Sequence, residues 1–186
     1  LSYIINYDWW DYMKRVSLKP LEVSDAGEVY ELCRGTFREE YHITEERILE
    51  SLFEDPDFSA EESKKIVDEK NGRMIGFIGV KVSHNEQLYP ASAWISIFAV
   101  KKEEQGKWYG TMVLNQVCQS LHKNGINKIY VGQDFNNFFS GIPDPDEGKE
   151  IFFKKNGFSN RGFTKDVRYE NKITRPGETT EKLNVR

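Results

Sequence analysis

The chain has 186 residues, of which 38% are hydrophobic and 30% are charged, and its formal net charge is −4. This composition predicts one soluble globular domain over residues 1–186 and excludes a disordered chain. No apolar run approaches the roughly 20 residues that span a bilayer, so we expect no membrane contact. The negative charge argues against nucleic acid as a partner.

The cysteines and histidines show no metal-ligand pattern. Cys33 and Cys118 both fall on predicted apolar helix faces, which favours reduced core residues of a cytoplasmic protein. The histidines, at positions 42, 84 and 122, have no Cys or His at i+3 or i+4, the spacing typical of a zinc site. We therefore expect no bound metal and a cytoplasmic location.

The first 15 residues form an aromatic extension that contains Tyr3, Tyr7, Trp9, Trp10 and Tyr12. Such side chains are not expected to remain in water. One interpretation is an extra strand or helix packed on the domain. The other is a segment that covers a substrate groove or the second subunit of a homodimer.

Elements with clear boundaries follow the extension. Residues 16–21 alternate as a strand does, and Ser24 or Asp25 is expected to cap a helix that runs to about Thr36. Thr44 is expected to cap a second helix, which ends before Asp55 because the following proline disfavours helical geometry there.

A hairpin and a central strand come next. Residues 64–70 and 73–82 are predicted to pair around Asn71-Gly72, the strongest short hairpin signal. After a loop at 83–90, a strand starts at Ala91 or Ala93 and ends at Val100, because this stretch is an apolar run too short for a buried helix.

The turn after the central strand has the properties of an anion site. From Thr111 onwards apolar residues recur at helical spacing, and the turn before this helix contains Gly106 and Gly110. Glycine lets the backbone approach a ligand, and the unpaired N–H groups of a helix start attract a phosphate. Lys107 adds a positive charge. An ordinary strand-to-helix connection is the alternative.

No internal repeat is found in the sequence. The remaining predictions concern the C-terminal third. In chain order we expect a helix stop at Asn124-Gly125, a strand at Lys128–Gly132, a loop at 133–148, a helix at Glu147–Asn156 stopped by Gly157, closing strands at 159–163 and 166–173, and a loose tail at 174–186.

Two stretches resemble motifs of the GNAT acyltransferase superfamily. Gln105–Gly110 resembles the family's pyrophosphate loop, [Gln/Arg]-x-x-Gly-x-[Gly/Ala], with Trp108 in place of the middle Gly. Residues 151–158 resemble its last-helix signature, a hydrophobic-Tyr-Glu-Lys-x-Gly-Phe run, with Phe153 in place of the Tyr. The two stretches stand in family order, and the resemblance covers about residues 16–169.

The resemblance implies a fold, an activity and a cosubstrate. The expected fold is α/β, with a mixed, mostly antiparallel sheet of about six to seven strands flanked by helices and a splayed strand pair that forms the acyl-CoA cleft. The expected cosubstrate is acetyl-CoA. The residues expected to contact it are Phe98, Val100, Gln105, Gly106, Lys107, Trp108, Gly110 and Thr111.

The expected reaction is direct attack of a primary amine, on a small molecule or a peptide, within a ternary complex. Asp134, Glu39 and Glu40 are candidate bases, and a water chain would also serve. Many relatives protonate the leaving thiolate with the Tyr that Phe153 replaces. A thiolate leaves tolerably without help, since its pKa is only about 8.5. Possible substitutes are Tyr109, Tyr130 and Tyr169.

Two questions stay open at the level of sequence. The loop at 134–143 is rich in Phe, and these rings are expected either to cover the pantetheine arm or the acceptor, or to pack into the core. The chain could also be a catalytically weak sensor or interaction domain that binds coenzyme A, because Trp108 and Phe153 depart from the family pattern.

Overall fold

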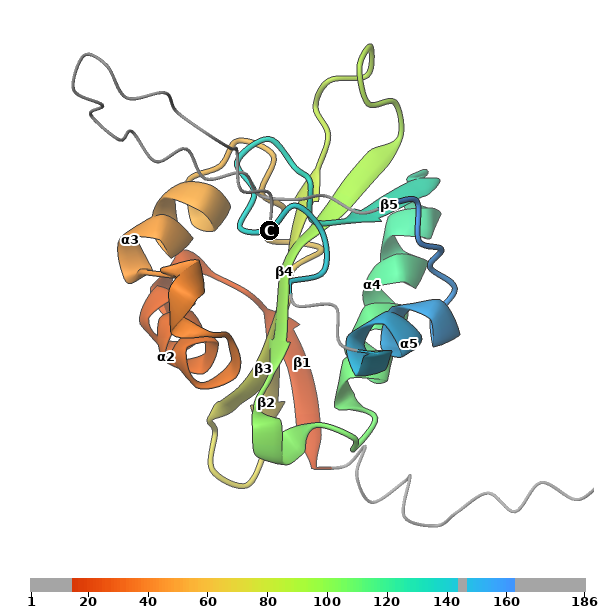
Figure 1. Cartoon of the computed structure of the whole chain (residues 1–186). Coiled ribbons are helices and arrows are strands. Elements are labelled where there is room, and N and C mark those ends of the chain that lie inside the picture. The colour runs from red at the N-terminus through yellow and green to blue at the C-terminus, as the bar shows by residue number, and fades with distance from the viewer. Residues whose placement is uncertain (1–14, 144–146, 163–186) are drawn as a thin grey trace, which may run out of the picture.

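A five-stranded mixed sheet organises the protein in the computed structural model, which describes residues 15–143 and 147–162. The strand order is β1-β2-β3-β4-β5, and all neighbouring pairs are antiparallel except β4 and β5, which are parallel and joined through α4. Helices α2 and α3 cover one face of the sheet, and α4 and α5 cover the other (Figure 1). In chain order the elements are β1 (Val16–Pro20), η1 (Val23–Asp25), α2 (Ala26–Thr36), η2 (Glu39–Tyr41), α3 (Glu45–Ile48), η3 (Leu49–Phe53), β2 (Lys64–Asp68), β3 (Met74–Val82), β4 (Ser92–Val100), η4 (Lys102–Glu104), α4 (Tyr109–Lys123), β5 (Lys128–Val131) and α5 (Glu147–Lys155).

Local signals at helix ends and turns are confirmed. Asp25 occupies the N-cap position of α2, although its side chain accepts hydrogen bonds from the Glu22 amide and Lys65 and not from an amide of α2. The Thr44 hydroxyl accepts a hydrogen bond of 3.1 Å from the Arg47 amide at the start of α3. The α3 helix continues as the π-helical turn η3 and stops before Asp55, as expected. Gly72 has a φ of 70° in the turn between β2 and β3, a conformation that glycine adopts without steric cost.

The predicted number of strands is wrong within the described residues, since the sheet has five strands and the prediction was six to seven. Residues 159–162 are not in a strand. Here the Asn160 side chain accepts a hydrogen bond from the Gly162 amide, which is a local alternative to a strand ladder. The second closing strand at 166–173, the aromatic extension up to residue 14 and the tail at 174–186 lie outside the described residues.

Two hydrophobic cores stabilise the sheet, one on each face. The core under α2 and α3 contains Leu32, Cys33, Leu52, Phe77, Ile97 and Ala99 among others, and the core under α4 contains Ile78, Val80, Ile95, Val113, Leu114 and Val117 among others. Both cysteines are free thiols, as predicted. Burial raises the pKa of the Cys33 thiol to about 12 and also raises that of Cys118, so both thiols resist ionisation.

None of the helices within the described residues is long and apolar enough to cross a bilayer. The same residues contain no cluster of His, Cys, Asp and Glu that could hold a metal ion.

Candidate active site

The turn between β4 and α4 presents main-chain amides at a helix start. Gly106 has a φ of 78°, and Trp108 is the N-cap of α4 with a φ of 67°. The first helical hydrogen bond runs from the Met112 amide to the Trp108 carbonyl at 2.9 Å. The amides of Gly110 and Thr111 precede this bond, so they point out of the helix end, where the helix dipole also favours an anion. The helix begins two residues before the predicted start at Thr111.

Side chains of the turn hold it against the end of β4. The Gln105 side-chain amide donates to the Val100 carbonyl at 2.9 Å, and the Lys107 ammonium lies 3.0 Å from Glu104. Trp108 is 65% exposed, so its indole projects into solvent and does not fill the bend. The turn therefore keeps an accessible backbone, although a bulky residue stands in it.

Trp108 occupies a left-handed conformation that costs a non-glycine residue about 1–2 kcal/mol. We expect Trp108→Gly to raise the free energy of unfolding by about 1 kcal/mol, because glycine adopts this conformation without the Cβ clash. Urea denaturation measures the change. Trp108→Ala is the control, since it removes the indole but keeps the Cβ atom. Equal stabilisation by Gly and Ala would show that the indole, and not the backbone, is responsible.

A β-bulge at Ser96 interrupts the pairing of β4 with β3. The register with β3 pairs Gly79 with Ile97 and Val80 with Ile95, which leaves Ser96 without a partner. The extra residue reverses the side-chain alternation: Ile95 packs in the core under α4, whereas Ile97 packs in the core under α2 and α3.

The strands β4 and β5 separate at the bulge. Their parallel pairing ends at Ile95 and Val131, and the Gly132 amide then donates to the Ile95 carbonyl at 2.9 Å. At the other end of β4, the Lys101 amide donates to the Ile75 carbonyl of β3. Because alternate amides of a strand face opposite sides, those of Phe98 and Val100 face away from β3, toward the side of β4 where the pairing with β5 has ended.

An aromatic cluster joins Phe98 at the end of β4 to helix α5. The Phe98 ring lies 5.8 Å from that of Phe152 and 6.4 Å from that of Phe153, and Phe153 in turn contacts Phe158. A Cβ atom at Gly110 would lie 3.4 Å from Phe98 and 3.5 Å from Phe152. Helix α5 therefore packs close to the start of α4, where a Cβ atom at position 110 would make ordinary van der Waals contact with both rings.

The tyrosines considered as replacements for Phe153 are not shown at the reaction site by any contact within the described residues. Tyr109 is buried in the core under α4, and Tyr130 stacks on Trp94 with their ring centroids 6.1 Å apart. Tyr169 lies outside the described residues.

The candidate bases differ in environment. The Asp134 side chain is 2% exposed, and its two oxygens accept hydrogen bonds from Lys81 at 2.5 Å and from Ser96 at 3.0 Å. Glu39 and Glu40 are exposed on η2, with Glu40 3.5 Å from Arg38. Asp134 is thus buried and hydrogen-bonded through both carboxylate oxygens, whereas the two glutamates are accessible to solvent.

Sequence reasoning missed Lys81 and Ser96, which contact Asp134, and Asp55, which contacts Lys81. Lys81 is 1% exposed and lies 3.0 Å from Asp55 and 2.5 Å from Asp134. A signal was present in the sequence, because a single lysine interrupts the otherwise apolar stretch MIGFIGVKV of β3. A lysine on a strand buried on both faces needs an acidic partner.

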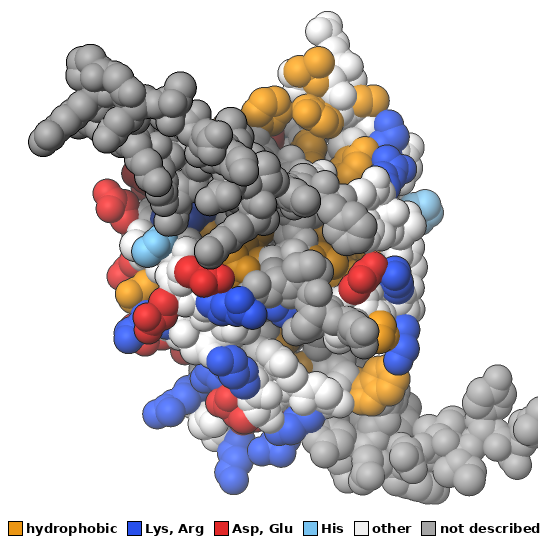
Figure 2. Space-filling view, in the orientation of Figure 1, with side chains coloured by type: hydrophobic (Ala, Val, Ile, Leu, Met, Phe, Trp, Pro, Cys, Tyr) orange, Lys and Arg blue, Asp and Glu red, His pale blue; other side chains and the backbone are white. Residues whose placement is uncertain are grey.

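The loop after β5 packs mainly into the core. Phe138 and Phe139 are buried, and Phe139 contacts Phe37 and Tyr41 with ring centroids 5.0 and 5.2 Å apart. Phe135 is 78% exposed and reaches Tyr89 in the connection between β3 and β4. Figure 2 shows hydrophobic side chains gathered over this projecting connection. The core interpretation therefore holds for two of the three rings.

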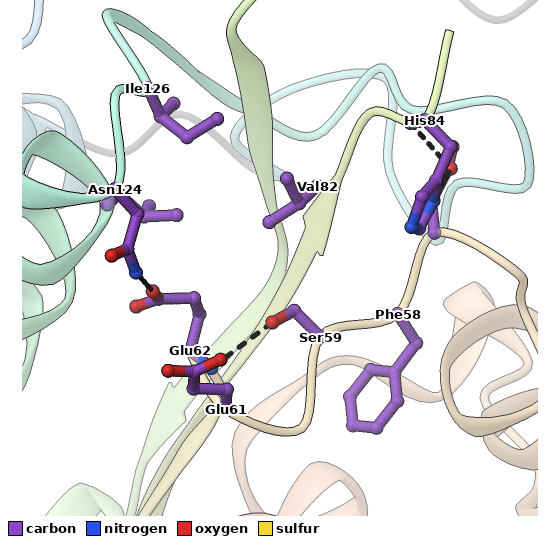
Figure 3. Close-up of a pocket in the computed structure, with 10 residues that line it drawn as sticks. Phe58, Ser59, Glu61, Glu62, Val82, His84, Asn124 and Ile126 are labelled. Atoms are coloured by element: carbon purple, nitrogen blue, oxygen red, sulfur yellow. Dashed lines mark hydrogen bonds and ion pairs between the residues drawn. The ribbon is translucent and has the colours of Figure 1, made fainter.

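A cavity of about 330 Å³ lies between the η3–β2 connection, the end of β3 and the end of α4. Glu62 lines it and accepts a hydrogen bond from Asn124 at 2.7 Å, while His84 pairs with Asp57 (Figure 3). The second carboxylate oxygen of Glu62 is buried and has no hydrogen-bond partner among the described residues. The cavity shares no lining residue with the Gln105–Thr111 turn, so it is separate from the predicted site.

Comparison with known proteins identifies the family of this arrangement. A sequence model described as the acetyltransferase (GNAT) family matches residues 26–140, more than half of the chain. No curated protein sequence is a significant match.

Solved structures with similar folds include three acetyltransferases. The GCN5-related glucosamine N-acetyltransferase region of a fungal multi-domain GH3 beta-N-acetylglucosaminidase has a TM-score of 0.67 and 20% identity, and the match covers 76% of this chain and 17% of that chain. Ribosomal-protein-S18-alanine N-acetyltransferase from Escherichia coli has a TM-score of 0.61 and 15% identity, with 79% of each chain covered. An aminoglycoside acetyltransferase from an uncultured soil metagenomic sample, in complex with sisomicin, has a TM-score of 0.59 and 16% identity, with 86% of this chain and 99% of that chain covered. These likenesses confirm the predicted mixed α/β fold.

Proposed function

The chain belongs to the acetyltransferase (GNAT) family, and from this membership we propose that it transfers an acetyl group from acetyl-CoA to a primary amine. The main support is that, within the described residues, the β5 side of β4 has no strand partner beyond Ile95, and that the strand leads to a helix start that suits an anion. We further propose that residues 1–186 act as one domain. The cytoplasmic location and the homodimer stay predictions.

The turn would hold the diphosphate of acetyl-CoA. Amides of Gly106, Trp108, Gly110 and Thr111 would donate to its oxygens, and the Thr111 hydroxyl could add one bond. The Gln105 side chain would act indirectly, since it already bonds the Val100 carbonyl and fixes the turn. Lys107, paired with Glu104, would contribute positive charge.

The side of β4 where the pairing with β5 has ended would hold the thioester. The acceptor nitrogen attacks the thioester carbonyl carbon, the carbonyl oxygen becomes negative, and the C–S bond then breaks to release the thiolate. Amides of Phe98 and Val100 would donate to that oxygen, and each such donor is worth roughly 2.7–4 kcal/mol. No acid is required at Phe153, because a thiol pKa of about 8.5 makes the thiolate a tolerable leaving group.

The acceptor must lose its proton before it attacks. The exposed Glu39 and Glu40 are the candidates whose carboxylates can reach an ammonium group, directly or through water. Their charge would also favour a cationic acceptor, either a small-molecule amine or a peptide amine. Asp134 is less accessible to an acceptor, because Lys81 and Ser96 occupy its two carboxylate oxygens.

A substrate panel tests the function. The full chain is incubated with acetyl-CoA and with aminoglycosides, amino sugars, polyamines or peptides, and free thiol and acetylated product are both measured. We expect thiol release above background together with a mass gain of one acetyl group on at least one amine. Binding of coenzyme A without any acetylated product would favour the alternative, a coenzyme A sensor. That alternative is motivated by Phe153, which cannot donate a proton, and by Trp108 in the turn.

A further inference from the structure

The buried cluster around Lys81 connects three separate parts of the chain. Lys81 lies on β3, Asp55 on the connection after η3, and Asp134 on the loop after β5. The Lys81 ammonium meets Asp55 at 3.0 Å, Asp134 at 2.5 Å and the Asn136 carbonyl at 3.2 Å. These three acceptors match the three protons of an ammonium group, so the cation is fully paired.

Asp134 extends this cluster to the bulge of β4. Its second oxygen accepts a hydrogen bond of 3.0 Å from the Ser96 hydroxyl, and Ser96 is the residue that has no partner on β3. A bulge disrupts the ladder locally, so other contacts must hold its conformation. Because the bulge shifts the alternation along β4, it also determines that the Phe98 amide faces away from β3.

We propose that the chain of contacts Lys81–Asp134–Ser96 positions the reacting carbonyl. It fixes the bulge, and through the bulge it directs the Phe98 amide at the thioester oxygen. The inference rests on the proposed acetyl transfer, and it makes Ser96 and Asp134 positioning residues, not bases. A buried charge network is suited to this task, because a half-satisfied network would be costly and only one arrangement satisfies all members.

The cluster provides a matched pair of variants. Asp134→Asn and Asp55→Asn each remove one of the two carboxylates that pair with Lys81, but only Asp134 contacts Ser96. Ser96→Ala removes the contact to the bulge and leaves all three charged groups in place. If Asp134→Asn does not fold, Ser96→Ala therefore still tests the proposal.

Steady-state kinetics and hydrogen exchange of the full-length variants separate positioning from stability. We expect Ser96→Ala and Asp134→Asn to lower kcat by about 10- to 100-fold, with KM for acetyl-CoA within about twofold of wild type. Asp55→Asn should lower the melting temperature about as much as Asp134→Asn does, while kcat changes by less than about twofold. Amides 96–100 should exchange faster in Ser96→Ala and Asp134→Asn than in Asp55→Asn, without any ligand.

Kinetics and hydrogen exchange distinguish a failure of the proposed function from a failure of the positioning role. If the wild-type protein binds coenzyme A but acetylates nothing, the proposed function fails, and selective exchange at residues 96–100 would still support the positioning role of Asp134. If the wild-type protein turns over and all three variants change kcat and exchange to the same extent, the cluster only stabilises the fold and the proposal is wrong.

Discussion

Replacing Gly132 with Ala is expected to lower the free energy of unfolding by at least about 3 kcal/mol. Gly132 has a φ of 64°, and a Cβ atom there would lie 2.5 Å from the Phe139 carbonyl oxygen and 2.8 Å from the Gly141 nitrogen. Both neighbours are main-chain atoms of the loop after β5, so they cannot move aside cheaply. Urea denaturation followed by circular dichroism measures the loss.

Gly125 provides the control for this prediction. It has a φ of 85°, but a Cβ atom there would meet nothing within 4 Å. Gly125→Ala should therefore lower stability only by the cost of the left-handed conformation, about 1–2 kcal/mol. Equal losses at the two positions would contradict the close packing of the loop against Gly132. The position matters for the site, because the Gly132 amide makes the bond to Ile95 where β4 and β5 separate.

Replacing Gly110 with Trp is expected to weaken coenzyme A binding by at least about 100-fold, or about 2.7 kcal/mol. The Cβ atom would already touch Phe98 and Phe152, at 3.4 and 3.5 Å. An indole must then either displace α5 or cover the amides of Gly110 and Thr111. Losing two hydrogen bonds to a charged diphosphate accounts for an effect of this size. Isothermal titration calorimetry with coenzyme A measures it.

Gln119→Trp is the matched control, since Gln119 is exposed further along the same helix. It adds the same side chain to α4 away from the turn, and it should leave the affinity unchanged. If Gly110→Trp binds coenzyme A as tightly as Gln119→Trp does, the diphosphate does not lie at this helix start.

Much of the fold was predictable from the sequence because its signals are local. The Asn71-Gly72 turn, the Thr44 cap and the stop at Gly125 depend on residues that are neighbours in sequence, and each is confirmed. The Gln105–Gly110 turn was recognisable for the same reason. The closing strand expected to start at Ser159 is absent from residues 159–162, where the Asn160 side chain accepts a hydrogen bond from the Gly162 amide.

The rest of the site depends on contacts between distant residues. The bulge at Ser96 has no mark in the apolar run AWISIFAV, because a bulge adds one residue without changing composition. Asp134 looks like a surface carboxylate until Lys81, 53 positions earlier, is placed beside it. Trp108 contradicts backbone preference, since sequence rules expect glycine where φ is 67°.

Amide chemical shifts of the 15N-labelled full chain, recorded during a titration with coenzyme A, show where the diphosphate and the thioester arm bind. We expect the largest changes at Gly106, Gly110 and Thr111, with further changes at Phe98 and Val100. Saturating coenzyme A that leaves these amides unchanged, or that shifts only the residues around Glu62, would contradict this expectation.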